Sequence, residues 1–369
     1  MTELKEICKV QCGFAFDSKK FTEDDSFSPL IRIRDVKRGF TQTYYTGEFS
    51  SEYIVHKGDL LVGMDGEFNI ARWNSEDALL NQRVCRIIAN SNVNEEYLRF
   101  YLKRALKLIE SKTSFVTVKH LSAKELNGLK LNLPCMEDQQ CISKQLSILE
   151  LVIRKNKKVL ELFDELVKAR FVEMFGDPVT NDMLWNTDVL KDICTKIGSG
   201  STPRGGKESY IDEGISLIRS MNVHNAYFEY KDLAHITLDQ AEKLNNVVVE
   251  HDDLLFNITG ASVARCCVVP SDVLPARVNQ HVCILRCREK INPIFLQELL
   301  VNENYQGKLL QIAKSGATRE AINKQQLESL EIVLPPLELQ NQFASFVEEI
   351  DKSRLLSNHS LFLIKSIIF

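Results

Sequence analysis

The sequence has no long hydrophobic run, no signal-peptide pattern and no excess of positive charge. No stretch of about 18 apolar residues is free of charged side chains, so a membrane-spanning helix is not predicted. Because the first residues, Met1 to Lys5, do not resemble a secretion signal, we expect a cytoplasmic protein without a membrane partner. The formal net charge of -4 argues against a histone-like protein but leaves room for a local basic surface that binds DNA.

The 10 cysteines do not have the spacing of a metal site. Neighbouring cysteines such as Cys8 and Cys12, or Cys283 and Cys287, are not Cys-x-x-Cys pairs, and no His-x-x-x-His pair accompanies them. A metal site is therefore not predicted. Buried free thiols are the simpler interpretation in a cytoplasmic chain.

Motifs of common enzyme classes are missing as well. The sequence contains neither Gly-x-Gly-x-x-Gly nor Gly-x-x-x-x-Gly-Lys-Ser/Thr, so no dinucleotide or nucleotide phosphate loop is indicated. It also lacks the Asn/Asp-Pro-Pro-Tyr/Phe motif of amino-methyltransferases and the Pro-Asp dipeptide of metal-dependent nucleases. The Gly-rich segment from Ile197 to Lys207 fits no phosphate motif, and it is either a DNA-backbone contact or a plain surface loop. We therefore predict no catalytic residue and no cofactor in this chain.

The most regular feature is a stripe of apolar residues with four-three spacing, interrupted by the polar Asn156 and Arg170. A narrow stripe of this kind is typical of a coiled-coil helix, which needs a partner helix. Pro134 and Gly176 mark its ends, which gives about 39 residues and a length of about 58 Å at 1.5 Å per residue. The residues predicted to pack are Ile142, Leu146, Leu149, Ile153, Leu160, Phe163 and Val167.

A second stripe near the end of the chain repeats the first in the same register. It opens after Pro335 and Pro336, and its polar Ser357 matches Asn156. Two stripes in one chain can bury each other only if the second helix runs back along the first, so we expect an antiparallel pair. Its predicted packing residues are Phe343, Val347, Ile350, Leu361, Ile364 and Ile368.

The segments before the two stripes also correspond to each other. Matching pairs are Leu4 to Cys8 with Leu190 to Cys194, Gly58 to Leu61 with Asp252 to Leu255, and Asn81 to Cys85 with Asn279 to Cys283. Short apolar runs predict strands at Leu60 to Val62, Val84 to Ile88, Leu254 to Phe256 and Val282 to Leu285, and helices are predicted at Tyr97 to Ile109 and Pro293 to Leu300. The predicted fold class is therefore α+β, with an internal repeat.

The repeat predicts four parts: a domain at 1–133, a long helix at 134–178, a second domain at 179–334 and a second helix at 335–369. Antiparallel helices would relate the two domains by a pseudo-two-fold axis and hold them apart. A length of about 58 Å corresponds to roughly one and a half turns of B-DNA. The arrangement would thus work as a ruler between two recognition units.

Several motifs together resemble the specificity subunit of type I restriction-modification enzymes. The motifs are Gly63 to Asn69, Arg72-Trp73 and Leu80 to Val84 in the first domain, Leu133 to Gln139 and Leu334 to Gln340 at the helix entries, and Phe171 to Asp177 at the exit of the first helix. The family usually has an acidic residue before the Gln of the helix entry, which Asp138 matches and Leu339 does not. The second stripe has no counterpart of 169–176, so the chain is either cut short there or has a naturally shorter helix.

The resemblance implies a non-catalytic subunit with two target recognition domains, each of which reads one half of a split, asymmetric double-stranded DNA site. The paired helices would set the gap between the half-sites and dock methyltransferase (M) subunits. Those partners would carry S-adenosylmethionine and modify adenine, while a restriction and translocation (R) subunit would join for cleavage.

Candidate DNA-contacting residues are those whose side chains can pair with base edges or phosphates. In the first domain they are Arg32, Arg34, Lys37, Asp65, Asn69 and Arg83, and in the second they are Ser201, Thr202, Arg204, Lys207, Arg219, Asn222 and Asn257. The Asn-Gln pairs at 81–82 and 279–280 occur in both domains although two different half-sites are expected. We therefore expect them to have a shared scaffold role.

Two alternatives remain at this point. The chain could be the recognition portion of a fused methyltransferase-nuclease, which predicts S-adenosylmethionine binding by this chain alone. It could instead be a coiled-coil adaptor that binds only protein, which predicts no DNA footprint and no salt-dependent affinity for DNA.

Overall fold

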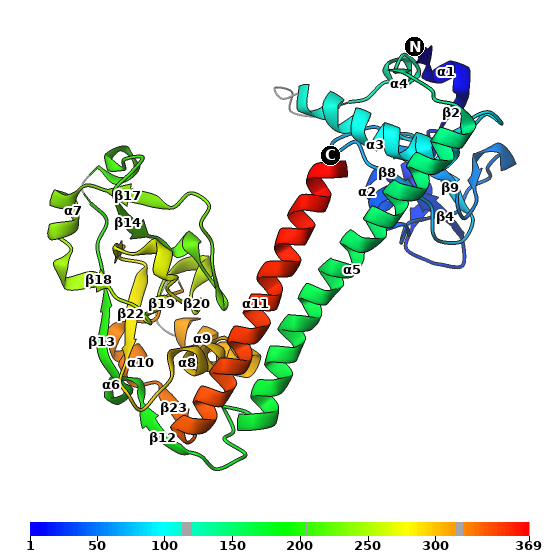
Figure 1. Cartoon of the computed structure of the whole chain (residues 1–369). Coiled ribbons are helices and arrows are strands. Elements are labelled where there is room, and N and C mark those ends of the chain that lie inside the picture. Colours follow the sequence, from blue (N-terminus) through cyan, green and yellow to red (C-terminus); the bar gives the residue numbers. More distant parts are fainter. Residues whose placement is uncertain (113–119, 204, 315–319, 369) are drawn as a thin grey trace. The chain divides into compact units, whose positions relative to one another are not determined.

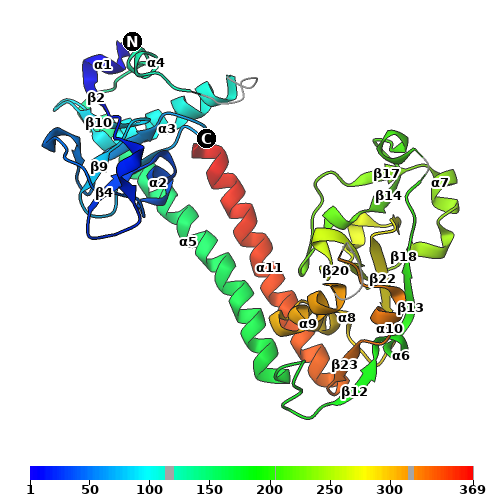
Figure 2. The same cartoon turned by 180° about the vertical axis from the view of Figure 1, so that it is seen from behind.

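The computed structural model describes residues 1–112, 120–203, 205–314 and 320–368. It consists of two compact units, one formed by Met1–Asn156 with Leu361–Phe369 and the other by Lys157–Ser360. Both contain mixed helix and sheet, as the sequence predicts (Figures 1 and 2).

The first unit is built on two sheets. An antiparallel sheet has the order β2 (Cys8–Cys12), β10 (Val84–Ala89), β7 (Leu60–Gly63) and β8 (Ile70–Arg72). The second has the order β3 (Phe21–Thr22), β5 (Tyr44–Tyr45), β4 (Ser28–Ile31), β9 (Ala78–Leu80) and β6 (Ile54–Val55), and in it only β4 and β9 run parallel. A small sheet joins β1 (Thr2–Glu3) to β11 (Lys130–Leu131). The helices are α1 (Leu4–Ile7), α2 (Ile33–Arg38), α3 (Glu95–Lys112) and α4 (Ala123–Asn127).

The second unit repeats the first sheet strand for strand, and its second sheet lacks only a counterpart of β3. Its first sheet has the order β13 (Cys194–Ser199), β22 (Val282–Cys287), β19 (Leu254–Asn257) and β20 (Cys266–Val268). Its second has the order β17 (Ala234–Ile236), β14 (Ile215–Ile218), β21 (Ala276–Val278) and β18 (Val248–Val249), again with one parallel pair, β14 and β21. Two small sheets pair β12 (Asn186–Val189) with β23 (Glu331–Leu334), and β15 (Val223–His224) with β16 (Tyr227–Phe228). Helices are α6 (Leu190–Ile193), α7 (Leu238–Glu242), α8 (Pro293–Val301), α9 (Glu303–Lys314) and α10 (Lys324–Glu328). The internal repeat and the predicted strands are confirmed.

Local sequence explains the matching helix starts. Ser122 begins α4 with a capping box in which its hydroxyl accepts from the Glu125 backbone N–H, and Asn323 begins α10 in the same way with Gln326. Asn292 caps α8, whose first residue is Pro293, a favoured residue at this position. Apolar residues of α3, among them Leu98 and Leu102, then cover the first sheet of their unit.

The two predicted long helices are confirmed as α5 (Met136–Phe175) and α11 (Leu337–Ile368). Within the second unit they run antiparallel. Phe171 of α5 contacts Phe343 at the start of α11, with ring centroids 5.6 Å apart, whereas the earlier Asp164 pairs with the later Arg354 at 2.7 Å. Helix α5 ends at Gly176, which has a positive φ of 71°, and the Trp185 indole N–H donates to the Phe175 carbonyl at 3.0 Å.

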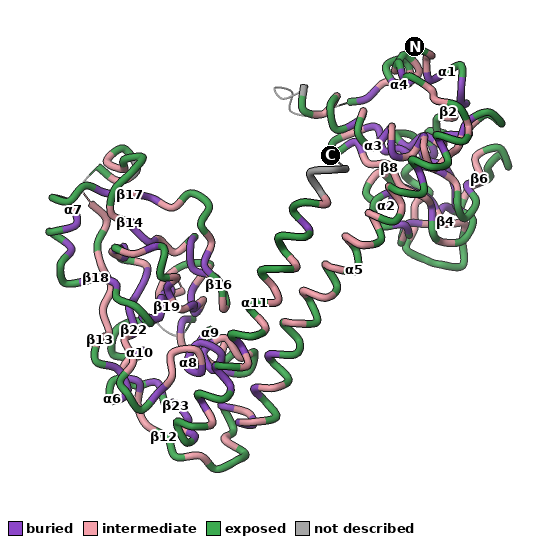
Figure 3. The backbone as a smooth tube through the Cα atoms, in the orientation of Figure 1, coloured by how far each residue is buried: buried purple, intermediate pink, exposed green. Residues whose placement is uncertain are grey.

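Most predicted packing residues are shielded from solvent, and Figure 3 shows the alternation of shielded and exposed positions along each long helix. The buried or half-buried ones are Leu146, Leu149, Ile153, Leu160, Phe163, Val167, Phe343, Val347, Ile350, Leu361 and Ile364. Ile142 is an exception with 36% exposure, because the first turns of α5 turn Gln139 and Ser143 to the interior instead. The side chain of Ile368 lies outside the described residues.

A buried glutamine fixes each long helix to the domain of its own unit. The Gln139 side chain accepts a hydrogen bond from the Asn94 backbone N–H at 2.8 Å and donates to the Pro134 carbonyl at 2.9 Å. Gln340 does the same with the Asn292 N–H at 2.9 Å and the Pro335 carbonyl at 2.8 Å. Their exposures are 1% and 0%. We call this pair of arrangements the glutamine clamps.

The cysteines are all unpaired thiols, and six of them are buried. Three others, Cys12, Cys135 and Cys141, are exposed, so the expectation of burial is wrong for these. Among the described residues no group of His, Cys, Asp and Glu could hold a metal ion. In the same part of the chain, none of the helices combines the length and the apolar character needed to cross a bilayer.

The clamp in the second unit generates a stability prediction. Replacing Gln340 with Ala leaves the Asn292 N–H and the Pro335 carbonyl without their partner, and each buried unsatisfied group costs about 1–3 kcal/mol. We expect urea unfolding of the Gln340→Ala chain to show a free energy of unfolding lower by about 2–4 kcal/mol. The exposed Gln342→Ala, two residues along the same helix, is the control. Equal losses in both variants would contradict a specific role for the clamp.

Candidate nucleic-acid interface

A surface concavity of about 630 Å³ lies in the first unit, and we call it the first concavity. Arg32, Arg34, Asn69 and Arg83 all line it, although they come from α2, the β7–β8 hairpin and the turn before β10. Phe16 and Phe21 line it as well. The fold therefore gathers residues far apart in the sequence into one basic and partly aromatic surface.

The remaining two candidates of this domain lie at the edge of the first concavity. Lys37 pairs with Glu67 at 3.2 Å, and Glu67 is itself a lining residue. Asp65 pairs with the Arg83 guanidinium at 3.4 Å. Burial is moderate, since the side chain of Arg83 is 51% exposed. All six predicted residues of the first domain are therefore accessible and close to one surface.

The second unit has a concavity of about 450 Å³ at the corresponding place, the second concavity. Its lining includes Met221, Thr259, Ser262, Arg265 and His281. The prediction did not include any of these five residues. A usable signal existed, because the sequence match of Asn279 to Cys283 with Asn81 to Cys85 places His281 where Arg83 stands.

In the second domain, fewer of the predicted DNA-contacting residues are exposed to solvent. Asn222 and Asn257 have 0% exposure and hydrogen-bond to backbone carbonyls, so the prediction that they contact DNA is wrong. Arg219 aims its guanidinium at the Asp232 carbonyl and lies over the Tyr210 ring, 5.5 Å from its centroid.

Two predicted residues of the 197–207 segment can be placed. Ser201 is exposed, and the Thr202 hydroxyl donates to Gln280, next to His281. Arg204 and the side chain of Lys207 lie outside the described residues.

The Asn-Gln pairs divide into a buried and an exposed member. Asn81 and Asn279 are 7% and 5% exposed, and the Asn279 side chain accepts from the His281 backbone N–H at 3.0 Å. Gln82 and Gln280 are exposed. A scaffold role therefore fits the asparagines, whereas the glutamines stand on the surface beside each concavity.

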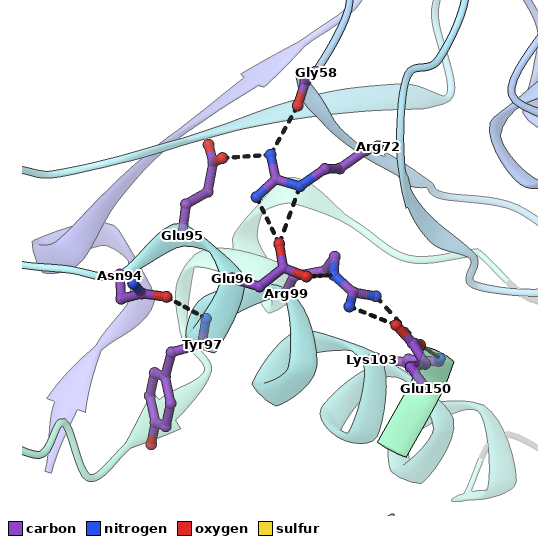
Figure 4. Close-up of polar contacts among 9 residues, drawn as sticks. All are labelled: Gly58, Arg72, Asn94, Glu95, Glu96, Tyr97, Arg99, Lys103 and Glu150. Atoms are coloured by element: carbon purple, nitrogen blue, oxygen red, sulfur yellow. Dashed lines mark hydrogen bonds and ion pairs between the residues drawn. The ribbon is translucent and has the colours of Figure 1, made fainter. Parts of the chain in front are cut away.

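An ionic network connects the first domain to α5, as Figure 4 shows. Arg72 in β8 pairs with Glu96 of α3 at 2.8 Å, Glu96 pairs with Arg99 at 2.5 Å, and Arg99 pairs with Glu150 of α5 at 2.6 Å. Lys103 also reaches Glu150 at 2.5 Å. Burial raises the pKa of Glu150, but the two cations outweigh it and hold that pKa below its ordinary value.

In the second unit, the contact between the domain and α5 is apolar. Phe295 of α8 packs against Phe171 and Phe175 of α5, with centroid distances of 5.8 and 4.8 Å. Nearby on α8, Glu298 is 8% exposed, and burial raises its pKa to about 7. A hydrogen bond from the Gln297 side chain at 2.8 Å and the positive charge of Arg354 oppose this rise in the pKa, whereas the negative charges of Asp351 and Asp164 add to it.

Comparison with known proteins identifies the family to which the chain belongs. A family model described as "Type I restriction modification DNA specificity domain" matches residues 1–162 and again 183–364, which is most of the chain. The chain belongs to the type I restriction-modification DNA specificity family. Specificity subunits are the DNA-recognition components of these systems and are not themselves catalytic.

Individual relatives agree with this assignment. The type I restriction enzyme EcoBI specificity subunit of Escherichia coli is 30% identical over 377 residues, covering 94% of this chain and 78% of that protein. The MjaVIII specificity subunit of Methanocaldococcus jannaschii is 21% identical over 316 residues, covering 82% and 74%.

Solved structures show the same fold. The S subunit of a type I system from M. genitalium gives a TM-score of 0.61 at 13% identity, covering all of this chain and 93% of that one. A structure from work on complex assembly and conformational transition of the type I system gives 0.58 at 17% identity, covering 100% and 94%.

The buried Glu298 generates a pH prediction. Its pKa rises from 4.5 to about 7 on folding, so the folded chain binds the proton more tightly than the unfolded chain does. The free energy of unfolding should therefore fall by about 3 kcal/mol between pH 4.5 and 7 through this group, and should stay level above pH 7.

In the Glu298→Gln variant, the fall in the free energy of unfolding between pH 4.5 and 7 should be smaller. The variant should be more stable than the parent at pH 8 by roughly 1–3 kcal/mol. Urea unfolding at a series of pH values measures it. The exposed Glu289→Gln is the control, and a variant at Glu298 that keeps the parent's pH profile would refute the assignment.

Proposed function

We propose that this specificity subunit reads a DNA site composed of two different half-sites, one with each recognition domain, and carries methyltransferase subunits on its long helices. In this proposal 1–133 and 179–334 are the reading domains, and 134–178 and 335–369 are the spacer helices. The observation that carries it is the repeat: two units whose first sheets have the same strand order present concavities of different chemistry at the corresponding place.

The chemistry of the two concavities supports two different half-sites. The first contains three guanidinium groups and two phenylalanine rings, suited to phosphates and to guanine edges. The second contains three hydroxyl groups, one imidazole and one guanidinium. Identical half-sites would favour identical linings, because the surrounding strands are the same.

Exposed leucines on the long helices support a docking role. In the second unit Leu162 and Leu166 of α5 are 47% and 46% exposed, one helical turn apart, and Leu355 and Leu356 of α11 are 69% and 72% exposed. Leucines this exposed on long helices are typical of protein interfaces. Methyltransferase subunits docked there would bring S-adenosylmethionine, a restriction subunit would complete the complex, and the setting would be the prokaryotic cytoplasm.

The recognition part of the proposal has a direct test. We expect co-expression of this chain with the methyltransferase encoded beside it to produce adenine methylation at a split motif, two short specific sequences separated by a fixed unspecific gap. Sequencing of methylated bases in the host DNA measures it. A continuous motif, or an unmethylated genome despite an intact complex, would contradict the proposal.

The docking part has a separate test. Leu162→Glu with Leu166→Glu places two charges on the exposed face of α5, and we expect recovery of the methyltransferase with the tagged chain to fall at least about tenfold, since burying unpaired charges costs several kcal/mol. The control is Leu238→Glu, which changes a leucine of 70% exposure on α7. Equal recovery for the two variants would count against docking on α5.

A further inference from the structure

The two concavities are framed by the same three backbone segments. In the first unit the Met64 N–H donates to the Arg83 carbonyl at 2.9 Å, and the Leu121 N–H donates to the Met64 carbonyl at 2.7 Å. In the second unit the Ile258 N–H donates to the His281 carbonyl at 3.0 Å, and the Ile322 N–H donates to the Ile258 carbonyl at 2.9 Å. Three segments thus cross in the same way in both units. They are the end of β7 or β19, the turn before β10 or β22, and the segment before α4 or α10.

This crossing defines three matched side-chain positions. Isolated bridges pair Asp65 with His120 and Thr259 with Ala321. A glycine with positive φ follows in each unit, Gly66 at 70° and Gly260 at 77°. Because these backbone hydrogen bonds are held in common, the side chains at these positions differ while the same three segments still cross. The matched positions are Asp65 with Thr259, Arg83 with His281 and His120 with Ala321.

The chemistry at these positions differs strongly between the units. In the first unit the three side chains form a charged cluster, in which Asp65 lies 2.5 Å from His120 Nδ1 and Arg83 lies 3.1 Å from the same nitrogen. In the second unit the Thr259 hydroxyl contacts His281 Nδ1 at 2.6 Å, and Ala321 contributes no polar group. Buried frame positions are alike by contrast, as Asn81 and Asn279 illustrate.

We propose that these three positions are the specificity determinants of each recognition domain, and that Arg83 reads a guanine. This assignment rests on the proposed function. Arg83 is 51% exposed, and its guanidinium pairs with one oxygen of Asp65 while the other oxygen accepts from His120 Nδ1. An arginine held in this way would present two parallel donors to the O6 and N7 acceptors of guanine. Arg83 also holds a φ of 73°, a strained value for a residue other than glycine, and such strain concentrates at functional sites.

The three matched residues of the second unit should read a different base, because His281 stands where the first unit has the guanidinium of Arg83. His281 lies between Thr259 and Gln280, whose amide nitrogen is 3.2 Å from His281 Nε2. Hydroxyl, imidazole and amide groups can each donate or accept, a pattern suited to an A·T pair rather than to guanine. The two half-sites should therefore differ in base composition at the positions read by these sets.

The test is an exchange of the set in the full chain, read by selection from a randomised duplex DNA library. The variant Asp65→Thr/Arg83→His/His120→Ala gives the first unit the residues of the second, and histidine tolerates the positive φ at position 83 better than most residues. We expect the wild type to enrich a split motif. The variant should change one half, with discrimination for guanine at one base pair falling about 5- to 150-fold, while the other half stays the same.

The control variant is His56→Ala/Asp77→Thr, which removes an exposed pair of the same residue types with an Nδ1 to Oδ1 distance of 2.8 Å. It should leave both halves unchanged, and a change equal to that of the exchange would overturn the assignment. Should the exchanged chain bind no DNA, Arg83→Lys decides instead, because lysine keeps the charge but lacks the fork of donors. Unchanged base preference in that variant would overturn the assignment.

The outcomes for the two proposals are distinct. Absence of any split motif with the wild-type chain overturns the proposed function, and the specificity assignment with it. A split motif that the exchange leaves intact in both halves overturns the specificity assignment alone.

Discussion

The glutamine clamps are the contacts on which the architecture depends. A helix of 40 residues such as α5 cannot position a domain unless its first turn is fixed to that domain. Gln139 and Gln340 do this by bonding at once to the Pro-containing entry of their own helix and to the residue just before an earlier domain helix, α3 or α8. Both amides are fully buried, so the bonds are shielded from competing water.

The two units differ mainly in the side chains that line their concavities and face solvent. The strand order of the first sheet and the crossing segments are shared, while the concavities carry three arginines in one unit and mainly hydroxyl and imidazole groups in the other. Tolerance of such change follows from the backbone bonds, because main-chain contacts such as Met64 to Arg83 do not depend on the side chain. The fold therefore separates the groups that hold the structure from the groups that face a ligand.

Much of the fold follows from sequence because its signals are local. The four-three stripe identifies α5 and α11, and apolar runs identify β7, β10, β19 and β22. Burial of polar residues is a tertiary property, which explains the errors. Asn257 resembles a base-reading residue in sequence, yet it lies inside the unit and bonds to the Ser220 carbonyl. The match of Thr259 to Asp65 could have been found, because each lies four residues after a leucine of the matched strands, Leu255 and Leu61.

The two contacts of α5, one with the domain of each unit, differ in how they respond to the surroundings of the protein. The first relies on Arg99, Lys103 and Glu150, an attraction that dissolved salt weakens. The second relies on Phe171, Phe175 and Phe295, whose association weakens on cooling. A rise in salt inside the cell should therefore loosen the first unit, and cold shock the second.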